Sequence, residues 1–336
     1  MFKTIRPLNS FRSNLVVLFA ITLAVVSLGC NDTSDDGTDT PKEPRTIDGS
    51  GNNRDNPSMG MALTQLFRLV FPDYSDGASG MAGADRPGAR LISNIVNDQE
   101  GSIPNTLGSS DYLWQWGQFL DHDIDLTENI IPPEPADIPV PPGDPFFDPE
   151  FTGTQVIFFN RSLYDPLTGT TDPRQQLNQI TSWIDASNVY GSDSGRAFAL
   201  RTNDGTGRLR TSEGDLLPFN TAGLPNAGGD DDTELFLAGD VRANEQVGLT
   251  AMHTLFVREH NRLAQEIAAG NPELNGDEIY EGARRIVGAQ MQAITYNEFI
   301  PALLGEGALE PYTGYDPDVN GSVMNLFSTA SFRLGH

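Results

Sequence analysis

The segment from Asp111 to Glu128 constrains the fold most, because it combines a helical apolar pattern with several ionisable side chains. Its apolar residues recur at helical spacing, at Leu113, Trp116, Leu120 and Ile124. A second face carries polar groups three and four residues apart, namely Gln118, Asp121, His122 and Asp125. Since each residue of a helix is rotated by about 100° from the last, Asp121, His122 and Asp123 point in three directions. Such a helix either exposes these groups to solvent or must provide buried partners for them.

The composition limits the possible partners and sites. The 336 residues can bury a sizeable core, and 46 acidic residues against 21 basic ones give a net charge of -25. This charge argues against binding to nucleic acid or to anionic membrane surfaces. The only cysteine is Cys30, which excludes disulfides within the chain, zinc–thiolate sites and iron–sulfur clusters.

The N-terminus has the pattern of an export signal. Basic residues precede an apolar run over residues 15–28, and the run ends in Ser-Leu-Gly-Cys30. This ending resembles a bacterial lipoprotein signal, which predicts that residues 1–30 form such a signal and that Cys30 is lipidated and becomes the new N-terminus. Plain secretion with cleavage nearby is the alternative. Residues 31–44 are rich in Asp, Thr and Pro and predict a flexible tether. We therefore expect an exported protein of the cell envelope or extracellular space, attached to a membrane only through Cys30.

The remainder, residues 45–336, reads as one mainly α-helical domain with long irregular loops and little β structure. Helical patterns cover residues 61–70, 246–269 and 277–298, and a short strand is predicted at 156–159. Residues 130–149 contain too many prolines for a helix or a central strand. Residues 204–232 are a Gly-, Asp- and Asn-rich loop.

The chain contains four histidines, which limits the candidates for catalysis and metal binding. His253 and His260 lie seven residues apart on one helical face among apolar neighbours, without the spacing of a zinc site. We interpret both as buried, hydrogen-bonded structural residues. His122 and His336 remain for function.

A second group of candidate ligands surrounds residue 183. Thr181, Asp185 and Ser187 offer side-chain oxygens at alternate positions, and Trp183 can offer its carbonyl. Calcium accepts such a set of oxygens, but one carboxylate is too few, and Asp123 is a candidate for the second. Ordinary turn formation by these residues is the alternative.

Arg242 and Glu245 lie three residues apart at the start of the predicted helix 246–269. By themselves they are consistent with a surface arginine and a carboxylate that favours a helix N-terminus.

Five segments, taken together and in order, resemble the animal-type haem peroxidases of the peroxidase–cyclooxygenase superfamily, in particular the peroxidasin- and myeloperoxidase-like members. They are Trp116–Asp123, Thr181–Ser192, Leu237–Glu245, Met252–Ala264 and Ser331–His336. The segment from Arg45 to Asn53 also resembles the opening of peroxidasin-like members. The likeness extends over nearly all of residues 45–336.

The resemblance implies a role for each matching position. His122 corresponds to the distal histidine, Gln118 to its neighbour over the haem iron, and Arg242 to the distal arginine. Asp121 and Glu245 match the carboxylates that form ester links to haem, and His336 matches the proximal iron ligand. The calcium site of the family corresponds to Asp123, Thr181, Trp183, Asp185 and Ser187.

The activity implied by the resemblance is that of a haem peroxidase. Such an enzyme reduces hydrogen peroxide and oxidises a small organic donor or a halide, with His122 and Arg242 assisting cleavage of the O–O bond. The implied cofactors are ester-linked haem b and calcium. Two alternatives are a fatty-acid dioxygenase of the same superfamily and an inactive, calcium-stabilised fragment that acts as a surface or adhesion module.

The sequence departs from the family pattern at its end, at Gln246, and at Gly51, where peroxidasin-like members have a cysteine. The chain ends at His336, whereas the family domain continues for many helices, so we expect a domain that is incomplete at its C-terminus. Gln246 stands where myeloperoxidase carries a methionine bonded to haem, so no sulfonium link is expected.

Overall fold

The computed structural model describes residues 45–228 and 233–335. The predicted signal and tether, residues 1–44, lie outside this range, and so does His336. The described part is 33% helix and 8% strand, which confirms the mainly α fold. Among these residues no helix is long and apolar enough to cross a bilayer.

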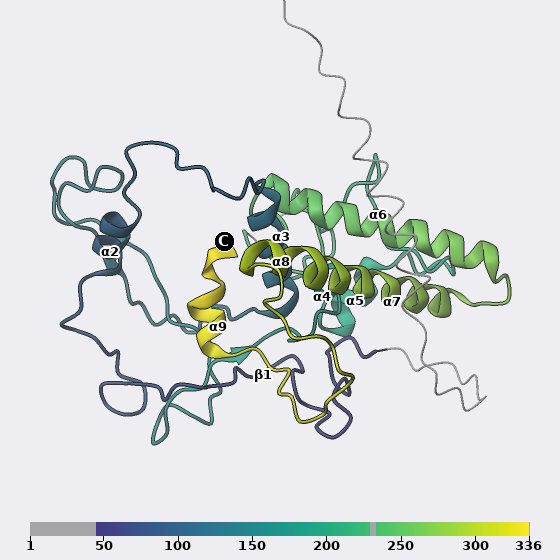
Figure 1. The fold of residues 1–336 in the computed structure, drawn as a ribbon, viewed down its shortest axis with the longest axis horizontal. Helices are drawn as coiled ribbons and strands as arrows, with labels where there is room; N and C mark the ends of the chain where they lie inside the picture. The colour runs from purple at the N-terminus through teal and green to yellow at the C-terminus, as the bar shows by residue number, and fades with distance from the viewer. Residues whose placement is uncertain (1–44, 229–232, 336) are drawn as a thin grey trace, which may run out of the picture. The chain divides into compact units, whose positions relative to one another are not determined.

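Two long helices pack against each other and extend to one side of the fold, the right in Figure 1. They are α6 (Val247–Gly270) and α7 (Gly276–Ile294), close to the predicted ranges. Helix α7 begins with a capping box, in which Asn275 and Glu278 exchange side-chain hydrogen bonds with each other's backbone. The apolar face of each helix is buried against the other and against the rest of the core, which explains why a periodic apolar pattern predicted both correctly.

Helix α7 was predicted to extend to residue 298, but its α-helical part ends at Ile294. It continues as a π-helix, η1 (Thr295–Phe299), and then as α8 (Ile300–Leu304). The Nε1 of Trp116 donates a hydrogen bond to the hydroxyl of Thr295, at 3.3 Å. The π-helical turn therefore begins at a residue that contacts the segment 111–128.

Helix α3 (Tyr112–Ile124) is buried from Gln115 to Ile124. It packs against α6, against the short helix α4 (Ser187–Tyr190), and against the C-terminal 3-10 helix η2 (Ser331–Gly335). The rings of Phe119 and Phe256 stack at 5.2 Å between α3 and α6. The alternative of a solvated polar face for this helix is therefore wrong, and its polar groups need buried partners.

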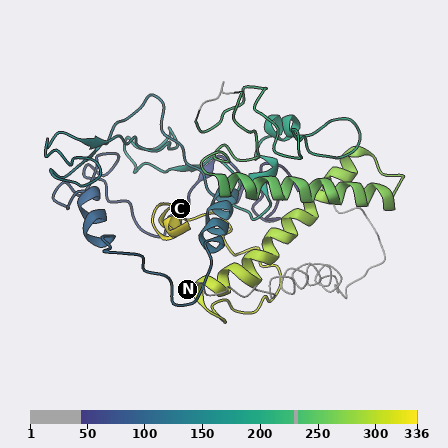
Figure 2. The same ribbon diagram turned by 90° about the horizontal axis from the view of Figure 1, so that it is seen from above.

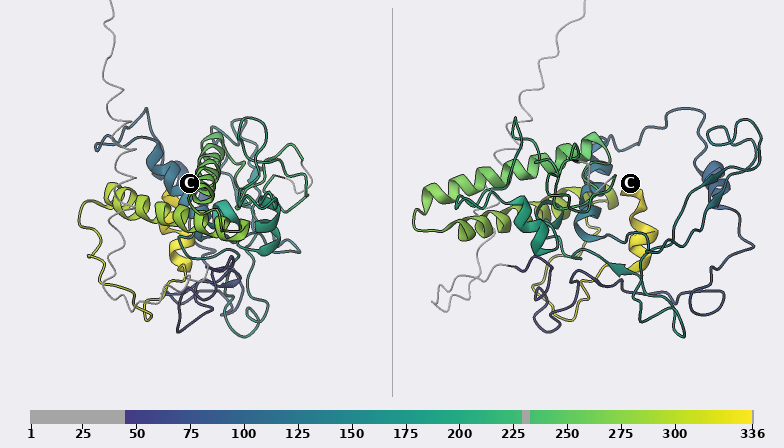
Figure 3. Two further views of the ribbon diagram at one scale, coloured as in Figure 1. Left: turned by 90° about the vertical axis from the view of Figure 1, so that its right-hand side faces the viewer. Right: turned by 180° about the vertical axis from the view of Figure 1, so that it is seen from behind.

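The rest of the described chain is mostly irregular. Four two-residue strands form two antiparallel pairs: β1 (Thr64–Gln65) with β4 (Leu177–Asn178), and β2 (Ile138–Pro139) with β3 (Val156–Ile157). The remaining helices are short, namely α2 (Ala89–Val96), α5 (Ser194–Leu200) and α9 (Asn325–Thr329). Helix α2 lies among loops, away from the α6–α7 pair (Figures 2 and 3).

One predicted helix is wrong. Residues 61–70 form turns and strand β1 instead. Leu63 has a φ of 64°, and the backbone N–H of Leu66 donates to the carbonyl of Gln176. Pairing with a segment more than a hundred residues away decides the conformation here, so a local apolar pattern was not a sufficient guide.

His260 is buried and hydrogen-bonded through both ring nitrogens, as predicted. Its Nε2 lies 2.9 Å from the carbonyl of Gly207, which can only accept, so Nε2 carries the proton. Its Nδ1, 2.8 Å from the Tyr190 hydroxyl, then accepts. His253 is also buried, with its ring edge-on to Phe119 at 5.0 Å. Neither of its ring nitrogens makes a hydrogen bond of normal geometry within the described residues.

The burial of His260 predicts a loss of stability in mild acid. Burial lowers the pKa of His260 from 6.5 to about 4, so the folded state resists protonation that the unfolded state accepts. The stability that depends on neutral His260 is fully present above pH 6.5 and is lost as the pH falls toward 4. Between about pH 7.5 and pH 5 this amounts to about 2 kcal/mol.

Urea unfolding at these two pH values measures the effect. We expect His260→Gln to lose about 2 kcal/mol less than the wild type between them, because it has no group to titrate. Tyr190→Phe, which removes the hydroxyl on Nδ1 but keeps the imidazole, should retain most of the wild-type loss. An equal loss in the wild type and His260→Gln would contradict this origin of the acid sensitivity.

Candidate functional site

The C-terminal half of α3 carries three consecutive ionisable residues, and all three are buried. Asp121, His122 and Asp123 point toward different neighbours, as the helical rotation requires. Asp121 faces the guanidinium of Arg242, with 3.6 Å between Oδ2 and Nη1. His122 faces Asp240, with 3.7 Å between Nδ1 and Oδ1. Asp123 faces helix α4.

Arg242 lies in the loop before α6, and its guanidinium donates hydrogen bonds to several acceptors. Its Nε and Nη2 donate to the two carboxylate oxygens of Asp240 at 2.9 and 2.8 Å, and Nη2 also donates to the carbonyl of Asp125 at 2.8 Å. The backbone N–H of Arg242 donates to Asp240 as well, at 2.8 Å. A planar guanidinium bound in this bidentate way has a fixed orientation.

Asp240 is the central acceptor of this group, and sequence reasoning did not single it out. Burial alone would raise the pKa of Asp240, but the charges of Arg242 and His122 outweigh burial and hold that pKa well below its usual range. Asp240 is therefore a carboxylate in the folded protein. Its position two residues before Arg242 was the available signal, because a buried arginine needs an anionic partner.

Glu245 and Gln118 form a second contact between α3 and the segment before α6. The Nε2 of Gln118 donates to Oε2 of Glu245 at 3.0 Å. The Nε2 of Gln246 donates to Oε1 of Gln118 at 2.9 Å and to Oε1 of Gln115 at 2.7 Å. Segments 111–128 and 237–246 thus meet through side-chain hydrogen bonds.

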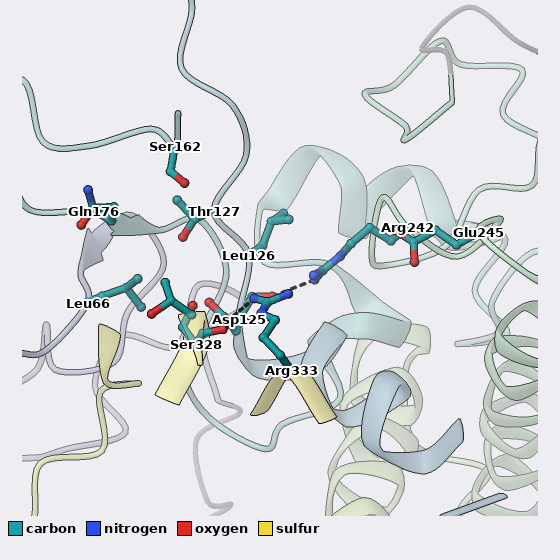
Figure 4. A pocket seen from close by; sticks show the side chains of 11 residues that line it. Leu66, Asp125, Leu126, Thr127, Ser162, Gln176, Arg242, Glu245, Ser328 and Arg333 are labelled. Atoms are coloured by element: carbon teal, nitrogen blue, oxygen red, sulfur yellow. Dashed lines mark hydrogen bonds and ion pairs between the residues drawn. The ribbon is translucent and has the colours of Figure 1, made fainter. Parts of the chain in front are cut away.

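A cavity of about 370 Å³ opens beside these residues (Figure 4). One part of its wall carries Asp125, Arg242 and Glu245, and another carries Ser328, Thr329 and Arg333 of the C-terminal segment. The Nη2 of Arg333 lies 3.7 Å from Oδ2 of Asp125 across the cavity. Its volume is within the range of small-molecule sites, about 300–1,000 Å³. His122, Asp121 and Gln118 are not among the residues that line the cavity.

The five predicted calcium ligands lie together. The hydroxyl of Ser187 donates to the carbonyl of Asp123 at 2.7 Å and lies 3.1 Å from its Oδ1. The hydroxyl of Thr181 lies 3.1 Å from Oδ2 of Asp185 and 3.4 Å from the carbonyl of Trp183. Two carboxylates, two hydroxyls and a carbonyl therefore lie close together. Thr181, Trp183, Asp185 and Ser187 belong to one turn that leads into α4, and Asp123 reaches that turn from α3.

Both carboxylates in this cluster are fully buried, which favours their neutral forms unless a cation is present. Burial, and secondarily the charge of Asp185, raises the pKa of Asp123 well above its usual value. Burial raises the pKa of Asp185 to about 6, against the opposing charge of Arg284. Within residues 45–228 and 233–335 no group of three or more His, Cys, Asp or Glu side chains could hold a metal. The cluster contains two such residues and fits only a cation that accepts neutral oxygens.

His336, the predicted iron ligand, lies outside the described residues. Helix η2, which ends at Gly335 directly before it, packs against α3. Within η2, Phe332 is buried and stacks on Phe327 at 4.9 Å.

Comparisons with known proteins agree on one family. The model of the family described as animal haem peroxidase matches residues 44–336. A peroxidasin homologue of Mus musculus is 39% identical over 87% of this chain, which spans 23% of that relative. Peroxinectin A of Dictyostelium discoideum is 35% identical over 97% of this chain, which spans 61% of that relative. The chain thus spans less than a quarter of the peroxidasin and about three fifths of the peroxinectin.

Solved structures show the same relationship. Peroxidase A of Dictyostelium discoideum has a TM-score of 0.78 at 32% identity, over 88% of this chain and 60% of the other. A fatty acid alpha-dioxygenase of Arabidopsis thaliana has a TM-score of 0.62 at 22% identity, over 78% of this chain and 37% of the other, which is a likeness of fold. From the family match and these relatives we conclude that the chain belongs to the animal haem peroxidase family.

Proposed function

We propose that this chain provides the peroxide-cleaving site of a haem peroxidase that oxidises a small organic donor or a halide. The observation that supports this most is the buried ion pair of Asp240 and Arg242 beside His122. A fixed cation next to an imidazole is the arrangement that peroxide cleavage needs, because it combines proton transfer with charge stabilisation. Membership of the animal haem peroxidase family supports the same activity.

The residues around the cavity fit a haem. The cavity presents the guanidinium group of Arg333, which suits a carboxylate of that cofactor. Glu245 also lines it, and Asp121 lies behind Arg242, so these two carboxylates are the candidates for ester links. His336, which follows η2, is the proposed iron ligand.

When bound, the haem supplies the iron that holds hydrogen peroxide and takes up its oxidising equivalents. The chain's own groups move protons and stabilise charge. His122 takes a proton from one peroxide oxygen and delivers it to the other, so that water can leave. We assign this transfer to Nε2, because Nδ1 faces Asp240. Arg242 stabilises the negative charge on the departing oxygen, and Asp240 keeps its guanidinium in one orientation.

The rate of reaction of the haem-loaded chain with hydrogen peroxide tests this assignment. We expect His122→Ala to slow it by about 10²–10⁴-fold, because the proton transfer is lost. Arg242→Gln should slow it by about 10²–10³-fold, because a fixed positive charge is lost. Stopped-flow absorption in the Soret region measures both rates.

Arg258→Gln is the matched control, since Arg258 is exposed and donates only to the backbone carbonyls of Gly214 and Asp215 among the described residues. It should react at the wild-type rate. Wild-type rates in both His122→Ala and Arg242→Gln would refute the proposed mechanism.

We further propose that Asp123, Thr181, Trp183, Asp185 and Ser187 bind calcium. The support is the convergence of their oxygens at a point where two buried carboxylates need a positive charge. Such a cation would join the end of α3 to α4 and thereby fix the direction of His122.

Removal of calcium should therefore destabilise the fold. At a hundredfold excess over its Kd, a ligand stabilises a protein by about 2.7 kcal/mol, which corresponds to a Tm shift on the order of 5–10 °C here. We expect a chelator to lower Tm by this amount and calcium, rather than magnesium, to restore it, as calorimetry would show. Asp123→Asn should abolish the calcium response. Asp76→Asn, at an exposed carboxylate that accepts three backbone N–H groups, should keep it.

The location of the protein remains a proposal that depends on residues 1–44. We propose export and lipid attachment at Cys30, on the basis of the signal pattern alone. Mass spectrometry of the mature N-terminus tests it directly.

The alternatives lack specific support. The fatty acid dioxygenases match at 22% identity, which is evidence for the fold and for no particular activity. A calcium-stabilised fragment without haem would bind calcium as above but would give no Soret band, so the peroxide experiment separates it from the peroxidase.

A further inference from the structure

A run of amide side chains connects the start of α6 to the carboxylate of Glu245. We propose that Gln246 is a positioning residue: through Gln118 it orients Glu245 so that this carboxylate can form its ester link to haem. The inference rests on the proposed haem-binding function. It goes beyond that function by assigning a role to Gln246, the position where the sequence departs from myeloperoxidase.

The orientation of Gln246 is fixed by the backbone. Gln246 is the N-cap of α6, and its Oε1 accepts a hydrogen bond from the backbone N–H of Gly248 at 2.6 Å. A backbone N–H can only donate, so the oxygen of this amide must face Gly248. The NH₂ group of Gln246 therefore points to the opposite side, toward α3.

The orientation of the two neighbouring amides follows from this. The NH₂ group of Gln246 lies 2.7 Å from Oε1 of Gln115 and 2.9 Å from Oε1 of Gln118. Both partners must present their oxygens to it. Gln115 accepts this arrangement although its own buried Nε2 then has no hydrogen-bond partner within the described residues. The hydrogen bond to the N-terminus of α6 therefore fixes the Gln246 amide, even though Nε2 of Gln115 is left without a partner among the described residues.

The last step reaches the carboxylate. With its oxygen toward Gln246, Gln118 has its NH₂ group toward Glu245, 3.0 Å from Oε2. This hydrogen bond fixes Oε2, and Glu245 lies in the wall of the cavity. One backbone N–H thus determines which way Gln118 points, and Gln118 determines how the carboxylate is held.

The covalent step balances with hydrogen peroxide as the oxidant. The carboxylate of Glu245 forms a C–O bond to a haem methyl group, which loses one hydrogen and is oxidised by two electrons. Hydrogen peroxide takes up the two electrons, and with the released proton and one more from solvent it gives two molecules of water. The position of the carboxylate oxygen relative to the methyl group controls this step, as for any reaction between held groups.

Gln246→Glu separates the capping role from the positioning role. A glutamate can still accept from the Gly248 N–H, but it has no NH₂ group for Gln118. Gln118 must then turn its own NH₂ group toward the new carboxylate and present its oxygen to Glu245. Gln246→Leu removes the cap and the amide together. Gln265→Glu, an exposed position on the same helix, is the control for added charge.

The experiment loads each full-length variant with haemin, treats it with hydrogen peroxide and measures covalent attachment at Glu245 and at Asp121 by peptide mass spectrometry. For Gln246→Glu we expect at least a fivefold loss of the Glu245 link per bound haem, with total haem and the Asp121 link unchanged. Gln265→Glu should match the wild type. An unchanged Glu245 link would overturn the proposal. An equal loss at both carboxylates would also overturn it, because a purely structural role of Gln246 predicts that the two links are affected alike.

A measurement without haem distinguishes failure of this inference from failure of the proposed function. In the haem-free chain, the Tm losses of Gln246→Glu and Gln118→Leu should sum to more than the loss in the double variant, because both act on one hydrogen-bonded chain. Additive losses would overturn the amide chain itself. If the losses are coupled but the protein binds no haem, the hydrogen-bonded run of amides would be supported. The haem-binding function on which its proposed role rests would be refuted.

Discussion

The placement of the site depends on one buried carboxylate, that of Asp123. It lies at the end of α3, where its oxygens approach the hydroxyl of Ser187 and the backbone N–H groups of Ala186 and Asn188. Burial beside Asp185 disfavours two negative charges, so the calcium ion that we propose here would stabilise the fold as well as the site. Because that end of α3 is fixed to α4, the helical rotation sets the directions of the neighbouring Asp121 and His122 side chains.

The charge of Arg242, whose side chain is 13% exposed, is matched by protein groups. Its charge is balanced by Asp240 and by Asp121, and its remaining donors reach a backbone carbonyl. An ion pair of this kind contributes little net stability, because desolvation offsets most of the attraction. Its value lies in the fixed direction of the guanidinium. The amides of Gln118 and Gln246 act in the same sense, as groups whose orientation is set by neighbours that can only donate or only accept.

The sequence predicted the parts of this structure that depend on local pattern. Helices α6 and α7 follow from apolar periodicity. The alternating oxygens of residues 181–187 lie close to one another and to Asp123, and calcium binding there stays a prediction. Long-range effects were missed. Pairing with Gln176 decides the backbone at Leu66, and the π-helical turn begins at Thr295, which meets Trp116 across the core. The direction of the Gln118 amide depends on α3 and the start of α6 lying side by side, which no local pattern gives. Asp240 had a local signal, its place two residues before Arg242, but its role depends on how deeply that arginine lies.

The central claim is that the chain binds haem, and we propose His336 as its iron ligand and His122 as the residue that transfers the peroxide proton. Absorption and magnetic circular dichroism spectra of the chain titrated with haemin test it most directly. The account predicts a one-to-one Soret complex whose axial-histidine signature is lost in His336→Ala and kept in His122→Ala. Identical spectra for the wild type and His336→Ala, or no stoichiometric complex at all, would contradict it.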